Sequence, residues 1–220
     1  MSVLKLITID GPSASGKSSV SREVARQLGW PWVSTGAFYR GLALVALKKN
    51  VPASDEKALV DLACDSLWTI EMTPEDTLVL FRDLDVTGDI FGEKVGAMAS
   101  QISQIPGVRA ALLQRQRDCF QPVKGLVAEG RDCGTVVFPN ATAKIYLTAS
   151  PSLRAMRRSE QEQGSLEETL KLQKNRDKQD SQRQVAPLKV ADGAMTIDSS
   201  YLSLTEVVEE VLKYAHSLGI

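Results

Sequence analysis

Residues 11–18 have the sequence GPSASGKS, which matches the pattern GxxxxGK[ST] in full. Glycines at positions 11 and 16 allow the backbone to curl, so that successive N–H groups converge on phosphate oxygens. The helix that follows adds the positive end of its dipole. In such a loop Lys17 bridges the β- and γ-phosphates, and the hydroxyl of Ser18 is a ligand for Mg²⁺. The sequence therefore predicts a nucleoside triphosphate site.

The segments on either side of this loop support that prediction. Residues 3–9 are apolar and largely β-branched, as expected for a buried parallel strand. Residues 17–28 have apolar positions at helical spacing and are followed by Gly29, a typical residue just after a helix. The alternative is a simple glycine- and serine-rich turn with a surface lysine. The order strand, loop, helix argues against it.

Further predicted strands and helices alternate along the chain and indicate an α/β protein with a P-loop kinase fold, in which helices flank a parallel sheet. Residues 67–86 differ, because three short β-rich pieces lie close together and predict a small antiparallel insert. Serines are expected to cap several helices. The predicted strands are 32–33, 126–128 and 143–147, the predicted helices are 37–48, 57–63, 93–104 and 108–120, and the expected caps are Ser54, Ser150, Ser165 and Ser203.

The composition argues against several classes of protein. The 220 residues include 26 basic and 27 acidic side chains, a net charge of −1, so nucleic acid is not an expected partner. The one histidine, His216, argues against a Ser-His-Asp hydrolase or a multi-histidine zinc site. Three cysteines without CxxC spacing predict reduced thiols packed in the core. No apolar run approaches the roughly 18 to 20 residues of a membrane helix, and no signal peptide is evident, so we expect a cytoplasmic protein with no membrane partner.

Arginines form a second set of candidate site residues. Thirteen of the 26 basic residues are arginines, and several lie beside glycine or at loop–helix junctions. A guanidinium stays charged and binds phosphate with two hydrogen bonds, so the set favours phosphoryl transfer between two phosphorylated substrates. The Asn-Lys-x-Asp element of guanine-binding switches does not occur. Glu129 ends a predicted strand where P-loop proteins place an acid near Mg²⁺, although a plain surface glutamate is the alternative.

Over essentially its whole length, the chain resembles the bacterial cytidylate kinases, which are nucleoside monophosphate kinases. The longest distinctive segment is EGRDCGTVVFP at 129–139, which adenylate and shikimate kinases lack. The other segments that carry the resemblance are ITIDGPSASGKSS at 7–19, STGAFYR at 34–40, ASQIS at 99–103, VR at 108–109, SLRAMRR at 152–158, RDKQDSQR at 176–183 and VAPL at 185–188. The resemblance implies one kinase domain over 1–220, with a monophosphate-binding insert at about 35–104 and a lid at about 154–183.

The resemblance also implies an activity and a set of site residues. The expected reaction transfers the γ-phosphoryl group of ATP to CMP, and also to dCMP, with Mg²⁺ as cofactor. ATP would be held by Gly11, Pro12, Ser13, Ala14, Ser15, Gly16, Lys17, Ser18, Ser19, Arg154 and Arg157. CMP would be held by Thr35, Tyr39, Arg40, Ser100, Arg109, Arg131, Asp132, Arg176, Asp180 and Arg183. Lys17, Arg131 and Arg158 would be the catalytic cations, with Ser18 bound directly to Mg²⁺ and Glu129 through water.

The chemistry of cytosine agrees with this assignment. The N4 amino group donates hydrogen bonds, which Asp132 can accept, and the O2 and N3 acceptors suit arginines. The chain departs from the family pattern at Ser34, where many relatives have Asp, and at Gln179 and Ser181, which are often basic. Two alternatives stay open: another small P-loop kinase, such as a UMP/CMP or dephospho-coenzyme A kinase, and a non-catalytic ATP-binding sensor. We expect a monomer, because no long apolar face is evident in the sequence.

Overall fold

A five-stranded parallel sheet forms the centre of the computed structural model, which describes residues 5–120, 123, 125–162, 165–183 and 185–220, with only the backbone at 161, 162 and 176. The strand order is β2-β6-β1-β7-β8, and each neighbouring pair is parallel. The strands are β1 (Leu6–Asp10), β2 (Trp32–Ser34), β6 (Leu126–Gly130), β7 (Ala143–Thr148) and β8 (Met195–Asp198). The carboxyl ends of these strands therefore meet at one edge, where ligands bind in open α/β sheets.

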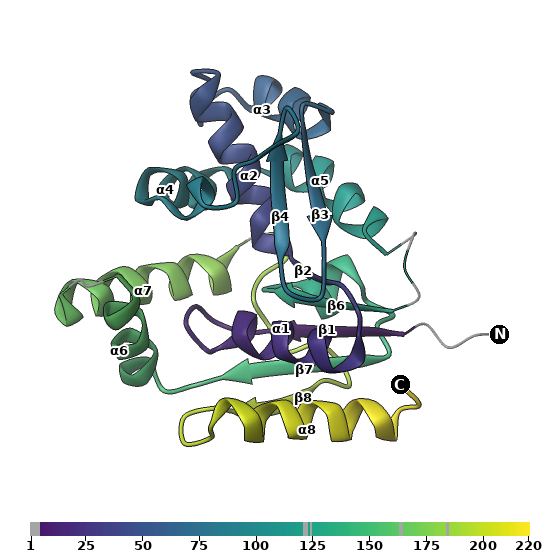
Figure 1. Cartoon of the computed structure of the whole chain (residues 1–220). Coiled ribbons are helices and arrows are strands. Elements are labelled where there is room, and N and C mark those ends of the chain that lie inside the picture. The colour runs from purple at the N-terminus through teal and green to yellow at the C-terminus, as the bar shows by residue number, and fades with distance from the viewer. Residues whose placement is uncertain (1–4, 121–122, 124, 163–164, 184) are drawn as a thin grey trace.

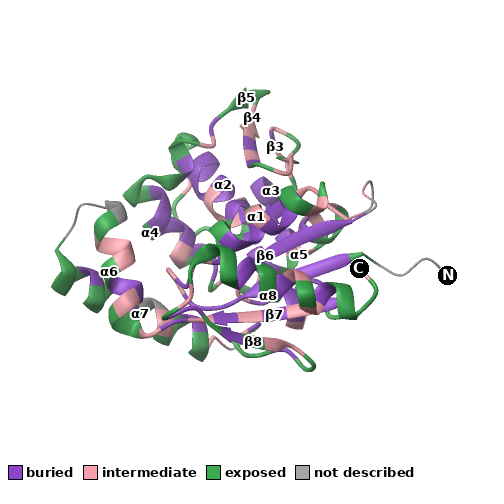
Figure 2. Cartoon of the chain, turned by 60° about the horizontal axis from the view of Figure 1, so that its bottom comes forward, coloured by how far each residue is buried: buried purple, intermediate pink, exposed green. Residues whose placement is uncertain are grey.

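Helices cover both faces of this sheet, which explains why the strands β1 and β6 are buried along their whole length (Figures 1 and 2). On one face Ile7 and Val127 pack against α1 (Lys17–Leu28) and α8 (Leu204–Ser217). On the other face Leu6 and Ala128 pack in the same core as α2 (Thr35–Lys48) and α5 (Pro106–Asp118). The predicted α/β class with a flanked parallel sheet is thus confirmed.

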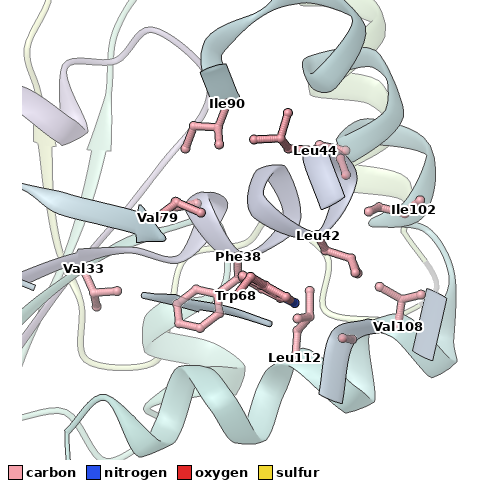
Figure 3. Packing of buried hydrophobic residues seen from close by; sticks show 14 of the residues in the cluster. Val33, Phe38, Leu42, Leu44, Trp68, Val79, Ile90, Ile102, Val108 and Leu112 are labelled. Carbon is pink, nitrogen blue, oxygen red and sulfur yellow. The ribbon is translucent and has the colours of Figure 1, made fainter. Parts of the chain in front are cut away.

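The predicted β insert is also present, as the antiparallel sheet β3-β4-β5. Trp68 at its base is 1% exposed, and its ring packs edge-on against Phe38 with centroids 6.4 Å apart (Figure 3). Its indole N–H donates to the carbonyl oxygen of Leu62 at 2.8 Å. The insert comprises β3 (Trp68–Met72), β4 (Thr77–Phe81) and β5 (Leu84–Asp85), packed against α2, and is followed by η1 (Asp89–Phe91) and α4 (Glu93–Ile102).

The turn between β3 and β4 lies against the free edge of β2. The backbone N–H of Trp32 donates to Thr73 O at 3.1 Å. The hydroxyl of Thr77 donates to Trp32 O and accepts from the Ser34 N–H, both at 3.0 Å. The insert thereby satisfies backbone groups that an edge strand would otherwise leave unpaired.

Two helices, α6 (Pro151–Glu162) and α7 (Leu166–Gln182), pack against each other and extend away from the sheet on the side of the β1–α1 loop (Figure 1). A short π-helical turn, η2 (Cys133–Val137), follows β6. No helix in the described part of the chain combines the length and apolarity needed to cross a bilayer.

Several local predictions need correction. Asp55, not Ser54, caps α3 (Glu56–Cys64), because its carboxylate accepts from the Ala58 N–H at 3.0 Å. Helix α5 begins at Pro106, two residues before the predicted start at 108, since a first-turn residue needs no N–H donor.

Other predictions at helix ends and cysteines had mixed outcomes. Ser203 forms the expected capping box, and Pro151 begins α6 as predicted. Ser165 precedes α7 without a side-chain capping bond. Cys133 is buried as expected, whereas Cys64 is exposed.

Candidate functional site

The P-loop connects β1 to α1 and is curled in the way its glycines allow. Gly11 and Gly16 have φ values of 154° and 92°, and Gly16 precedes the first turn of α1. A Cβ on Gly11 would collide with the carbonyl oxygen of Leu147 on the neighbouring strand β7. Both positions therefore require glycine, as the phosphate-binding pattern predicts.

Three of the predicted site cations donate to successive carbonyl oxygens of this loop. Arg131 Nη1 donates to Gly11 O at 2.9 Å, and Lys17 Nζ donates to Pro12 O at 2.7 Å. Arg154 Nη1 donates to Ser13 O at 3.1 Å. Side chains from the loop after β6, from α1 and from α6 thus converge at one loop, which sequence spacing alone could not establish.

Lys17 is 6% exposed, so its ammonium group has little access to water. Burial and, to a lesser extent, the nearby Arg131 lower its pKa to about 7, while Glu129 and Asp10 act in the opposite direction. A phosphate anion placed at this lysine would favour the charged form. The loop is therefore set up to gain from a negatively charged ligand.

The stability of the nucleotide-free protein is expected to rise with pH because of Lys17. Its pKa is near 10.5 when unfolded and about 7 when folded, so between these values the unfolded state binds more protons. Relative to a Lys17→Met variant, the wild type should gain up to about 1.4 kcal/mol of unfolding free energy per pH unit between roughly pH 7 and 9. Urea unfolding at several pH values measures this difference. Parallel pH profiles for the two proteins would contradict it.

Asp10, at the carboxyl end of β1, holds the loop that follows β6. Its carboxylate accepts the N–H groups of Cys133 and Gly134 at 2.9 and 2.7 Å. Burial raises its pKa to about 6, although these two hydrogen bonds act in the opposite direction. The sequence analysis did not single out Asp10. Its position could have indicated its importance, since it is an acidic residue at the end of a buried strand, directly before a P-loop.

Two residues predicted to bind the cytosine ring, Arg109 and Asp132, are in contact close to Tyr39 of α2. Arg109 Nη2 pairs with Asp132 Oδ2 at 2.5 Å, and both residues are 7% exposed. The Arg109 guanidinium also lies 5.6 Å from the centre of the Tyr39 ring. Burial raises the pKa of Asp132 and raises that of Tyr39 to about 12, so the Tyr39 hydroxyl keeps its proton at neutral pH. The structure thus brings Arg109 and Asp132 close to Tyr39, which the resemblance assigns to the phosphate of CMP.

Helix α7 contributes two carboxylates to the arginines around the P-loop. Asp180 accepts from Arg131 Nε at 2.7 Å and also pairs with Arg183. Asp177 binds both terminal nitrogens of Arg154, at 3.3 and 2.8 Å. Asp177 was not among the predicted site residues, and nothing in its sequence context distinguished it.

Helices α4 and α7 also meet at a predicted CMP-binding residue. The hydroxyl of Ser100 on α4 donates to Gln179 Oε1 on α7 at 3.2 Å. The side chain of Arg176, predicted to bind the sugar, lies outside the described residues.

Three further predicted arginines lie on α2 and α6. Arg40 Nη1 donates to Ile90 O at 2.8 Å, at the insert side of α2. Arg157 donates to Ser199 O at 3.0 Å, and the Ser199 hydroxyl donates to Ser15 O at 3.1 Å. Arg158 is a partly buried residue of α6.

Hydroxyl and carboxylate oxygens gather at the first turn of α1. The Ser18 hydroxyl donates to Glu129 Oε1 at 3.2 Å, and the Ser34 hydroxyl donates to the same oxygen at 2.5 Å. Thr35 Oγ1 donates to the Glu129 carbonyl at 2.9 Å. Ser19, one residue along α1, is exposed.

These groups fit Mg²⁺. The ion prefers oxygen ligands and commonly uses one or two carboxylates together with substrate phosphates. Ser18 and the 5% exposed Glu129 supply such oxygens beside the phosphate loop. Within the described residues there is no cluster of three or more His, Cys, Asp or Glu side chains suited to a metal.

The fold and this site define a P-loop kinase. Solved structures with the same fold include a gluconokinase from Sinorhizobium meliloti 1021, with a TM-score of 0.51 and 17% identity over 97% of this chain and 93% of that one. Another is the shikimate kinase from Acinetobacter baumannii in complex with shikimate, with a TM-score of 0.50 and 14% identity over 99% and 96% of the two chains. At these identities the likeness concerns the fold alone.

Sequence comparison specifies the family. The family profile described as cytidylate kinase matches residues 7–217. The cytidylate kinase of Bdellovibrio bacteriovorus is 54% identical over 95% of this chain and 96% of its own, and that of Methylococcus capsulatus is 44% identical over 97% and 98%. The chain belongs to the cytidylate kinase family, as the sequence resemblance implied.

Proposed function

We propose that the chain transfers the γ-phosphoryl group of ATP to CMP, giving CDP and ADP, and that it also accepts dCMP. Membership of the cytidylate kinase family supports the reaction with CMP. The structural observation that carries the proposal is the position of Arg131. Its side chain donates to Gly11 O of the P-loop and to Asp180 of α7, so one guanidinium adjoins both the ATP and the CMP sides.

On the ATP side, the P-loop N–H groups and the α1 N-terminus bind the β- and γ-phosphates. Lys17 leaves Pro12 O and bridges these phosphates, because a phosphate oxygen is a stronger acceptor than a peptide carbonyl. The Arg154 guanidinium, held in one plane by Asp177, stacks on adenine. Arg157 and Arg158 of α6 approach the ATP phosphates when the lid moves.

On the CMP side, Asp132 accepts from the cytosine N4 amino group, and a carboxylate has enough acceptor positions to keep Arg109 as well. Tyr39, Arg40 and Arg131 hold the phosphate of CMP. Ser100, Arg109 and Arg183 bind the ring acceptors, and Thr35 lines the site. Arg176 and Asp180 bind the sugar hydroxyls, and these two residues determine how well dCMP is accepted.

The reaction depends on positioning and charge neutralisation, because the acceptor phosphate is already ionised near neutral pH. Ser18 and Glu129 would hold Mg²⁺, which would neutralise charge on the phosphate oxygens. Lys17, Arg131 and Arg158 stabilise the charge on the transferred group. No histidine base is required.

Two segments close over the substrates in this proposal. Residues 35–104 form the monophosphate-binding insert, and residues 154–183 form the lid, which includes most of α6 and all of α7. The Ser100–Gln179 hydrogen bond supports closure, because it joins the two segments directly. Closure excludes water and limits hydrolysis of ATP.

A substrate panel is the direct test of this proposal. A coupled assay of ADP formation should give high kcat/KM for CMP and dCMP, and at least about 10²-fold lower values for UMP and AMP, because uracil and adenine lack the hydrogen-bonding pattern that the buried Asp132 requires. Equal rates with UMP would indicate a UMP/CMP kinase. Binding of ATP and CMP without turnover would indicate a sensor.

We also propose a monomer in the cytoplasm, without membrane or nucleic-acid partners. All three cysteines are free thiols, which agrees with a reducing compartment. The net charge of −1 gives no overall attraction to nucleic acid.

A further inference from the structure

We propose that Ser34 is a positioning residue for the metal side of the site, acting on Ser18 through the Glu129 carboxylate. The inference rests on the proposed binding of Mg²⁺ by Ser18 and Glu129. It concerns a residue to which neither the expected site nor the family comparison assigns a role.

The contacts form a short chain of hydroxyl and carboxylate groups. Ser34 and Glu129 are cross-strand neighbours in the parallel pair of β2 and β6. The Ser34 hydroxyl donates to Glu129 Oε1 at 2.5 Å, and the Ser18 hydroxyl donates to that same oxygen at 3.2 Å. The shorter of the two hydrogen bonds to this carboxylate oxygen thus comes from Ser34.

The backbone around Ser34 is itself held from the insert. The Thr77 hydroxyl accepts from the Ser34 N–H at 3.0 Å and donates to Trp32 O at the same distance. Thr77 is 7% exposed, so water competes little for these bonds. The β3–β4 turn therefore fixes the strand from which the Ser34 side chain reaches Glu129.

The role follows from the hydrogen-bonding capacity of a serine hydroxyl, which has one proton and two lone pairs. When Ser18 donates its proton to Glu129, its lone pairs are available to a cation. That arrangement requires the Glu129 carboxylate to stay in one orientation, and Ser34 holds it there with a second hydroxyl. Groups that orient metal ligands in this way typically change metal affinity 10- to 100-fold when removed.

The test compares nucleotide binding with and without metal. Ser34→Ala should weaken the binding of the Mg²⁺ complex of a β,γ-imido ATP analogue by roughly tenfold, while metal-free binding changes by less than about twofold. Calorimetric titrations with Mg²⁺ and with EDTA measure both affinities. Equal losses in the two titrations, or no loss in either, would overturn the inference.

Matched variants separate this inference from general damage and from failure of the proposed function. Ser66→Ala, at an exposed serine just before β3, should match the wild type in both titrations. Ser18→Ala should also weaken only the Mg²⁺ complex; if it does and Ser34→Ala does not, the inference fails while the metal assignment stands. If Ser18→Ala leaves Mg²⁺ dependence unchanged, the metal assignment itself fails.

Three further variants extend the test, two of them at positions other than 34. Thr77→Val removes the hydroxyl that holds Ser34, and should reproduce a weaker form of the Ser34→Ala effect, whereas Thr69→Val on the exposed side of β3 should not. Ser34→Asp replaces the donor with a second carboxylate beside Glu129, so the Mg²⁺ concentration needed for tight binding should change while the KM for CMP stays constant. A large change in the KM for CMP would contradict a metal-side role.

Discussion

Replacement of Lys17 by methionine is expected to lower kcat by roughly 10³-fold without unfolding the protein. The variant keeps the length of the side chain but removes the charge that would meet the β- and γ-phosphates. In the nucleotide-free structure Lys17 is buried and donates to Pro12 O at 2.7 Å, and burial lowers its pKa to about 7. Removing this buried cation should therefore leave the free energy of unfolding unchanged or higher at neutral pH.

A coupled assay and a urea unfolding curve on the same preparation test both parts of this prediction. Lys57→Met, at an exposed lysine of α3, is the matched control and should retain wild-type kcat. Near-normal turnover by Lys17→Met would exclude the P-loop lysine from catalysis. Loss of the folded state would instead show that Lys17 has a structural role.

Replacement of Asp132 by asparagine is expected to raise the KM for CMP by about 10- to 100-fold and to change the KM for ATP by less than about twofold. The carboxylate accepts from the cytosine amino group, whereas an asparagine amide presents one acceptor and a competing donor. Its partner Arg109 is as deeply buried, so asparagine is a better test than alanine. Alanine would leave the Arg109 charge unpaired, at a cost of roughly 3–5 kcal/mol of stability.

Separate titrations of CMP and ATP at saturating concentrations of the other substrate measure the two effects. Asp61→Asn, an exposed aspartate of α3, controls for the change of charge and should match the wild type. Equal losses for CMP and ATP would remove Asp132 from base recognition. A raised KM for UMP as well as CMP would show that it acts on the sugar or phosphate instead.

Most of the fold could be predicted from local sequence patterns, because each such pattern acts within a short segment of the chain. The strand, glycine loop and helix of the P-loop are adjacent in sequence, and the helix boundaries at Lys17 and Leu28 match the structure. The short β-rich pieces between 67 and 86 predicted the antiparallel insert for the same reason. The helix predicted over 108–120 begins earlier, at Pro106, because proline can begin a helix as well as end one, and only the flanking backbone distinguishes the two.

The sequence by itself determined the class of chemistry, since the P-loop glycines, Lys17 and the arginines suit phosphate binding wherever they lie. Only the tertiary structure decided which of these groups meet. Arg131 and Asp180 are 49 positions apart, and Ser34 and Glu129 are 95 apart, yet each pair is in hydrogen-bond contact. Such contacts depend on strand order and helix packing, which arise from burial of the whole core. For that reason the contacts of Asp10, Asp177 and Ser34 became evident only from the folded chain.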